Sequence, residues 1–155
     1  LTSIMSTTGN PSVGQPHEAA MQMLLGPAPT DLEGVIASSL EAWKVTGSPG
    51  FPFHEDLVRA GIEAAYHRAF HPQGTARQLA AIVASPDRTP ELRNLRTPTL
   101  VIHGDADTLV DPSGGVATAE AVPGAQLWTI AGCGHDLPRE IFDEVGDRLV
   151  SHCLG

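Results

Sequence analysis

The apolar and polar positions divide this chain into a short strand, a long helical stretch and a final part in which strands and helices alternate. Residues 1–5 have the pattern of the end of a buried strand, and the Ser-, Gly- and Pro-rich residues 6–16 predict a loop. Between residues 17 and 86, apolar side chains recur at helical spacing and no strand pattern occurs. The helices expected in this stretch are 17–25, 31–45, 55–70 and 75–84.

Two of the expected helices carry features that predict their ends and their buried faces. Thr30 and Glu33 have the spacing of a capping box, so the second helix is expected to begin just after Thr30. Its predicted apolar stripe is Leu32, Ile36, Leu40 and Trp43. The closing helix has a proline in its first turn, where proline is tolerated. Its predicted stripe is Ile141, Phe142, Val145, Leu149 and Val150.

After Pro98, the pattern of apolar positions changes from helices alone to alternating strands and helices. Apolar and β-branched residues predict strands at 99–103 and 125–130, and helical spacing returns at 112–122 and 138–152. The run 99–103 lacks apolar–polar alternation, so we expect it to be buried on both faces, as in a parallel sheet. The pattern therefore predicts an α/β fold in which a helical insertion separates the first strand from the last two.

Composition narrows the possible functions. The chain has 155 residues, 41% of them hydrophobic, which is typical of one globular domain. Its formal charge is −9, which argues against nucleic acid as a partner because phosphate binding needs clustered Lys and Arg. No apolar stretch is long enough to predict a membrane span. The chain begins with Leu1, inside a strand pattern, so we expect it to be a piece of a larger protein.

Two short motifs follow the last two predicted strands, HGDAD at 103–107 and GCGHD at 132–136. Ligands of parallel sheets bind beyond the carboxyl ends of the strands, and neighbouring strands lie about 4.8 Å apart. Asp107 and His135 are therefore expected to meet. A carboxylate on one imidazole nitrogen fixes the tautomer and leaves the other nitrogen free to accept a proton. The motifs thus predict the acid and the base of a Ser–Asp–His triad, although no Gly-x-Ser-x-Gly occurs in the chain.

These motifs carry a family resemblance. The segment TPTLVIHGDADTLV (97–110) resembles the strand-and-acid segment of α/β-hydrolase fold enzymes, and AGCGHDLP (131–138) is similar to their Gly-x-Gly-His segment. The resemblance maps the acid to Asp107 rather than Asp105, and the base to His135. It departs from the family at Cys133, where a larger apolar residue is usual; we interpret this as a packing variation.

The resemblance implies the C-terminal part of an α/β-hydrolase fold with an inserted helical cap. It divides the chain into the end of a core strand and a loop (1–16), the cap with its return linker (17–96), and the core segment with acid and base (97–155). Within the family, the chain most resembles esterase or lipase-like members. The implied partners are a small ester substrate and the missing N-terminal half of the same fold, which would supply the serine and the oxyanion hole. No cofactor is implied, and the isolated chain is expected to be inactive.

Apolar residues near the motifs are candidates for a substrate pocket. Met5, Trp43, Leu109 and Val110 are the principal ones, with Phe51 and Phe53 beside them. Ordinary core or cap packing is the competing interpretation for all of them, and for Trp43 it is the favoured one. His103 is interpreted as a structural support rather than as a base.

Other chemistries fit the sequence less well or stay open. Asp105, Asp107 and Asp111 lack the remaining residues of a calcium loop, and His67 and His71 lack the glutamate of a zinc helix, so no metal site is expected. A haloalkane dehalogenase or an epoxide hydrolase of the same fold, with an Asp nucleophile, stays open. So does a non-catalytic binding module that lacks the nucleophile.

Overall fold

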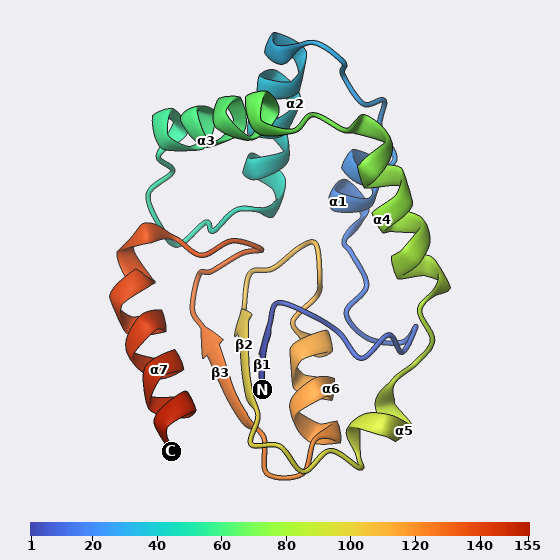
Figure 1. Ribbon diagram of the computed structural model, residues 1–155, viewed down its shortest axis with the longest axis vertical. Helices are drawn as coiled ribbons and strands as arrows, with labels where there is room; N and C mark the ends of the chain where they lie inside the picture. Colours follow the sequence, from blue (N-terminus) through green and yellow to red (C-terminus); the bar gives the residue numbers. More distant parts are fainter.

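A three-stranded parallel sheet forms the centre of the molecule. The computed structural model describes residues 1–155. The strand order is β1-β2-β3 (Figure 1), and the strands are β1 (Thr2–Ile4), β2 (Leu100–Gly104) and β3 (Gln126–Ile130). In register, Ile4 lies beside Ile102, and Ile102 beside Trp128. Every residue of β2 is buried, which confirms the expected burial of this strand on both faces.

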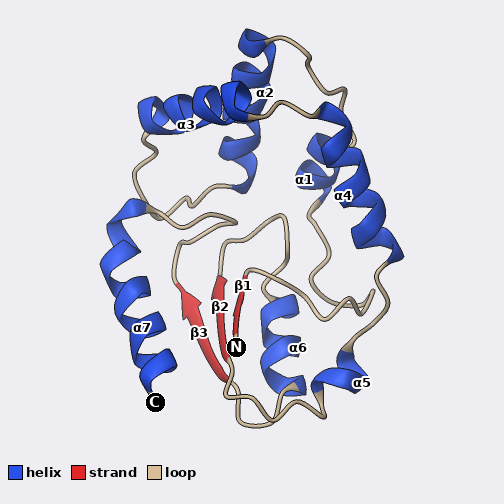
Figure 2. Cartoon of the chain, viewed as in Figure 1, coloured by secondary structure: helices blue, strands red, loops and turns tan.

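The first two strands, adjacent in space, are separated in sequence by a helical region, residues 18–84. Its helices are α1 (Glu18–Leu24), α2 (Leu32–Thr46), α3 (Glu55–Arg68) and α4 (Pro72–Ala84). They lie beyond the carboxyl ends of the strands (Figures 1 and 2). Only α1 and α2 bury side chains, with Ile36 and Leu40 as the anchors of α2, whereas α3 and α4 have no buried residue. The buried anchors of this region are therefore in its first two helices, α1 and α2.

Two helices cover the two faces of the sheet. The closing helix α7 (Phe142–Leu154) follows a short 3-10 helix, η1 (Arg139–Ile141), and its Val145 joins the main core cluster with Leu100 and Ile102 of β2. Helix α6 (Ser113–Ala121) lies on the other side of the sheet (Figure 1) and contacts β2 and β3. Alternate side chains of β2 point to opposite faces, so the residues between Leu100, Ile102 and Gly104 face α6.

Small residues let α6 approach β2 closely. Gly114, Gly115, Thr118 and Ala121 are its buried residues. A Cβ added at Gly115 would clash with Nδ1 of the His103 ring and lie 2.8 Å from its Cγ, so a larger residue there would displace either the helix or His103. Helix α6 and His103 are thus packed as one unit.

Several predicted details differ from the structure. Helix α2 is capped by Asp31, whose Oδ1 accepts the Gly34 N–H at 2.9 Å, so the expected capping box at Thr30 is wrong by one residue. In the closing helix Ile141 and Val145 are buried, but Phe142 and Val150 are 58% and 57% exposed, so the predicted stripe was too wide. The four-residue helix α5 (Thr89–Leu92) was not predicted because it is too short to show a period. No helix combines the length and the apolar character that crossing a bilayer requires.

The close approach of α6 predicts that Gly115→Ala destabilises the fold. The added methyl overlaps the buried His103 ring, and such overpacking costs about 1–3 kcal/mol. The matched control is Gly146→Ala in α7, where nothing lies within 4 Å of the added Cβ and the better helix propensity of Ala is expected to leave stability equal or higher. Urea unfolding monitored by circular dichroism measures both. Equal stabilities of the two variants would contradict this packing.

Candidate active site

Asp107 and His135, which follow adjacent strands, are in direct contact. Nδ1 of His135 lies 2.8 Å from Oδ2 of Asp107. The Asp107 side chain is fully buried, whereas that of His135 is 28% exposed. The carboxylate of the pair is therefore shielded from solvent, while the imidazole is partly exposed. Nε2 of His135 makes no hydrogen bond to any other residue.

The two loops that carry this pair approach each other closely at Gly104. A Cβ there would clash with the backbone of Cys133 and Gly134, so no larger residue fits at this exit from β2. Two hydrogen bonds then connect the loops: Ala106 N–H donates to Cys133 O at 3.0 Å, and Asp105 Oδ1 accepts the Gly132 N–H at 2.7 Å. Asp105 is thus a turn support, while Asp107 reaches the histidine.

Asp107 is held as a carboxylate. Its Oδ1 accepts the backbone N–H groups of Leu109 and Val110, both at 2.9 Å, and its Oδ2 faces His135. Burial opposes ionisation, but the hydrogen bonds from His103, His135 and Val110 outweigh this effect and hold the pKa of Asp107 well below its usual range. A negative charge therefore remains beside the imidazole at neutral pH.

His103 supports the same turn from the α6 side. It is 1% exposed, and its Nε2 lies 2.8 Å from Val110 O and 3.4 Å from Asp107 Oδ2. The carbonyl can only accept, so Nε2 carries the proton and donates. Nδ1 is a buried atom without a partner. This placement agrees with the expectation that His103 is a support and not a base.

Residues 46–50, which are the end of α2 and the start of the following loop, pack on the histidine loop, residues 132–136. His135 N–H donates to Thr46 O at 2.7 Å, and Gly50 N–H donates to Gly132 O at 2.8 Å. In the sequence, residues 47–53 contain two glycines and two prolines, a composition that predicts a loop and no particular partner. The contact of this loop with the histidine loop joins segments about 85 positions apart, which no local pattern signals.

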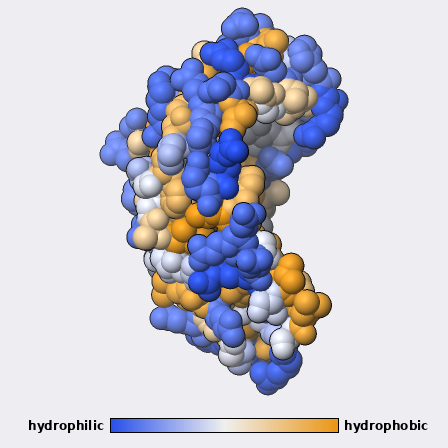
Figure 3. Space-filling view, turned by 90° about the vertical axis from the view of Figure 1, so that its left-hand side faces the viewer, coloured by the Kyte–Doolittle hydropathy of each residue, from blue (hydrophilic) through white to orange (hydrophobic).

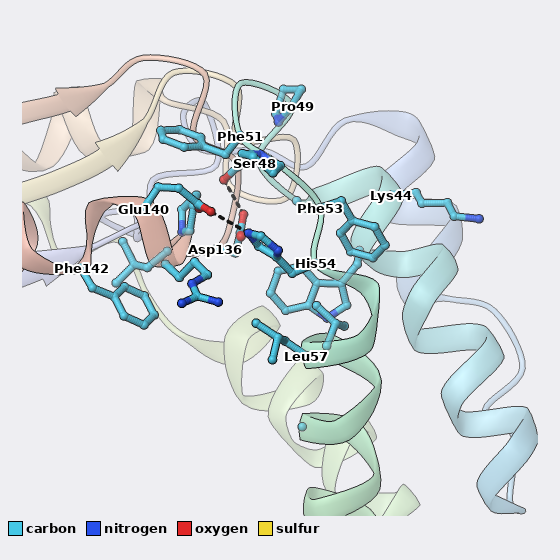
Figure 4. Close-up of a pocket in the computed structure, with 18 of the residues that line it drawn as sticks. Lys44, Ser48, Pro49, Phe51, Phe53, His54, Leu57, Asp136, Glu140 and Phe142 are labelled. Atoms are coloured by element: carbon cyan, nitrogen blue, oxygen red, sulfur yellow. Dashed lines mark hydrogen bonds and ion pairs between the residues drawn. The ribbon is translucent and has the colours of Figure 1, made fainter.

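A cavity of about 1000 Å³ lies beside this site, between α2, α3 and residues 136–142 (Figure 4). Its polar wall includes a hydrogen bond between His54 Nε2 and Glu140 Oε1 at 2.6 Å, which lowers the pKa of Glu140. Its apolar wall includes Trp43, Phe51, Phe53, Leu57, Leu137 and Phe142. Figure 3 shows apolar residues gathered midway along this side of the molecule, between the helical region and the part that contains the sheet and α7.

The candidate pocket residues are placed differently from one another. Trp43 lines the cavity, as do Phe51 and Phe53. Met5 is 8% exposed and belongs to the main core cluster, and it has an unusual positive φ of 46° at the end of β1. Leu109 and Val110 are half-buried in the turn that binds Asp107. The cavity is bounded by Asp136, next to the histidine, but not by Asp107 or His135 themselves.

The aspartates of the candidate metal loop all have other roles. Asp105 and Asp107 make the contacts described above. Asp111 Oδ1 accepts the Ser113 N–H at 2.9 Å just before α6, and its Oδ2 lies 3.3 Å from His17 Nε2. The hydrogen bonds from Ser113 lower the pKa of Asp111. No group of three or more His, Cys, Asp or Glu side chains is arranged to hold a metal ion.

Comparison with known proteins gives consistent relatives. A model of the serine aminopeptidase S33 family matches residues 15–141. The chain is 28% identical over 148 residues to rhodomycin D methylesterase DnrP of Streptomyces peucetius, covering 95% of this chain and 49% of the relative. It is 31% identical over 158 residues to a monoacylglycerol lipase of Mycolicibacterium smegmatis, covering 88% of this chain and 55% of the relative. The chain thus spans about half the length of the curated relatives it matches.

Solved structures show the same fold. The enol-lactonase of Burkholderia xenovorans LB400 superposes with a TM-score of 0.71 at 22% identity, over 99% of this chain and 55% of that one. The esterase RhEst1 of Rhodococcus sp. ECU1013 gives a TM-score of 0.57 at 25% identity, over 90% of this chain and 49% of that one. These matches confirm the resemblance expected from the two motifs, and the chain belongs to the serine aminopeptidase S33 (Hydrolase_4) family of α/β-hydrolase fold proteins.

Proposed function

We propose that Asp107 and His135 are the acid and the base of a hydrolase that cleaves carboxylic esters through a Ser–Asp–His triad. The serine lies outside these 155 residues. The observation that carries the proposal is the 2.8 Å contact between a buried, ionised carboxylate and Nδ1 of an imidazole whose Nε2 makes no other bond. Relatives named as a methylesterase and a lipase favour an ester as the substrate.

In the proposed mechanism, Nε2 of His135 takes the proton of the serine hydroxyl as its oxygen attacks the ester carbonyl. The negative charge of Asp107 stabilises the imidazolium that forms. The imidazolium then gives its proton to the departing alcohol, which leaves an acyl-enzyme. His135 next takes a proton from water as the water oxygen attacks the acyl carbonyl. The imidazolium then returns that proton to the serine oxygen as the C–O bond of the acyl-enzyme breaks, which releases the carboxylic acid and restores the serine and the neutral imidazole. Asp107 stays ionised throughout.

The proposed domain division follows the same reasoning. Residues 1–16 and 97–155 belong to the core, and 17–96 form a cap with its return linker. The position of the helical region beyond the carboxyl ends of the strands supports this division (Figure 1). We propose Trp43 as a substrate contact on the cap side because it lines the cavity, and Leu109 and Val110 as contacts on the core side because their N–H groups bind Asp107. Met5 stays a candidate from the sequence, and its place in the core cluster favours a packing role.

The triad proposal predicts large losses of activity in the polypeptide that also contains the upstream half. His135→Ala is expected to lower kcat about 10³–10⁴-fold, and Asp107→Asn by a similar factor because it removes the charge that stabilises the imidazolium. The control is His71→Ala, since His71 is exposed and makes no side-chain hydrogen bond. Hydrolysis of p-nitrophenyl butyrate measures all three. A His135→Ala variant with near wild-type kcat would refute the role of the base.

The location of the nucleophile gives a second prediction. The purified 155-residue chain is expected to hydrolyse no p-nitrophenyl ester above background and to take up no fluorophosphonate label. The longer polypeptide is expected to be labelled at a serine upstream of Leu1. Ester hydrolysis by the 155-residue chain that His135→Ala removes would place the nucleophile within it. An aspartate in place of the serine, in the turn between strand and helix that carries the nucleophile, would instead indicate dehalogenase or epoxide hydrolase chemistry. A turn with neither a serine nor an aspartate there would indicate a binding module.

The ionised state of Asp107 predicts how stability depends on pH. Its pKa is lower in the folded chain than in the unfolded one, so its contribution is complete above the ordinary carboxyl pKa of 3.8 and is lost as pH falls toward the folded pKa. Below about pH 3.8, the wild type is expected to lose up to about 1.4 kcal/mol per pH unit more than Asp107→Asn. Urea unfolding from pH 2.5 to 7 measures the difference. Parallel stability curves for the two proteins would contradict a depressed pKa.

A further inference from the structure

The loop that carries the base depends on the cap for two of its backbone hydrogen bonds. Besides the bonds from His135 N–H to Thr46 O and from Gly50 N–H to Gly132 O, the loop packs so closely that a Cβ on Gly134 would clash with Thr46 O and Gly47 O. The histidine loop contains Gly132, with a φ of +71°, and Gly134, so its backbone is intrinsically permissive. A permissive loop needs external contacts to hold one side chain in one orientation.

Ser48 is the one side chain of the cap loop that bonds to both neighbours of His135. Its Oγ donates to Asp136 Oδ1 at 2.5 Å (Figure 4). The same atom accepts the Gly134 N–H at 2.9 Å and lies 3.5 Å from Cys133 Sγ. The single hydroxyl therefore fixes the backbone before the histidine and the side chain after it. It does not contact the imidazole itself.

We propose that Ser48 is a positioning residue for the base, through which the cap holds the His135 ring against Asp107. This inference rests on the proposed function of His135 as the base. The Nδ1–Oδ2 hydrogen bond is directional, and a displacement of about 1 Å at a catalytic group can cost about 100-fold in rate. Ser48 thus makes the orientation of the base conditional on the cap being seated.

The attachment of the cap makes this coupling physically reasonable. Helices α3 and α4 bury no residue, so they add little apolar packing that could hold the cap on the core. Around the cavity, the cap contacts residues 132–142 through residues 46–50 and through the hydrogen bond of His54 with Glu140. Burial raises the pKa of Asp136, and the Ser48 hydroxyl opposes this by binding the carboxylate. Loss of the Ser48 hydroxyl would therefore remove its bonds to the Gly134 N–H and to the Asp136 carboxylate together.

The test uses ¹⁵N-labelled 155-residue chain and needs no activity. Long-range ¹H–¹⁵N spectra report the tautomer of His135, and a low-field Nδ1–H resonance reports its bond to Asp107. We expect this resonance in the wild type and in Ser48→Thr, which keeps the hydroxyl. In Ser48→Ala we expect it to broaden or disappear, with the ring nitrogens shifting toward a mixture of tautomers. The control is Ser38→Ala, an exposed serine of α2 that makes no side-chain hydrogen bond.

A second variant guards against an unfolded Ser48→Ala protein. Asp136→Ala leaves Ser48 in place but removes the acceptor of its hydroxyl, and it is expected to weaken the same resonance. Full retention of the Nδ1–H resonance in folded Ser48→Ala, or in Asp136→Ala where Ser48→Ala does not fold, would overturn the role of Ser48 and leave the proposed triad intact. Absence of the resonance in the wild type would overturn the Asp107–His135 pair and the role of Ser48 with it.

Discussion

The close approach of two loops at the carboxyl ends of β2 and β3 is the constraint on which the site depends. Parallel pairing brings the two strand ends together, and the missing side chain of Gly104 lets the backbone of Cys133 pass over the exit of β2. Only at this separation can Asp105 bind the Gly132 N–H and Asp107 reach His135. A residue larger than glycine at position 104 would move both loops, and the acid and base would separate.

Burial gives that contact its chemical character. Asp107 lies out of solvent, where an unpaired carboxylate would be unfavourable, and its charge is tolerated because each oxygen has fixed donors. Those donors come from the turn itself and from His135, while the His103 ring, packed against α6, lies 3.4 Å from Asp107 Oδ2 on the other side. Helix α6, which packs on one face of the sheet, therefore affects the charge environment of Asp107 through the buried His103 ring.

The parts of this arrangement that could be predicted from the sequence are those with a local signal. The two apolar runs, the glycines and the order of Asp107 and His135 predicted both strands and their meeting, because a parallel sheet aligns its strand ends. The capping residue of α2 was misplaced because Thr30 and Asp31 are both good caps, and only the bond to Gly34 distinguishes them. The exposure of Phe142 and Val150 depends on where α7 crosses the sheet, which helical spacing does not encode.

Ser48 shows the same limit at the site itself. Nothing in the sequence near Gly47 and Pro49 connects this serine with residues 134–136, because the contact exists only after the helical region has folded back over the sheet. Contacts between the ends of neighbouring strands thus have a local sequence signal, whereas contacts between the helical region and the core have none. Asp107 and His135 are brought together by neighbouring strands, while the loop that bears His135 is held by a segment that lies far earlier in the chain. Under the roles proposed here, Asp107 is held within its own strand–loop unit, whereas the placement of His135 depends in part on the helical region.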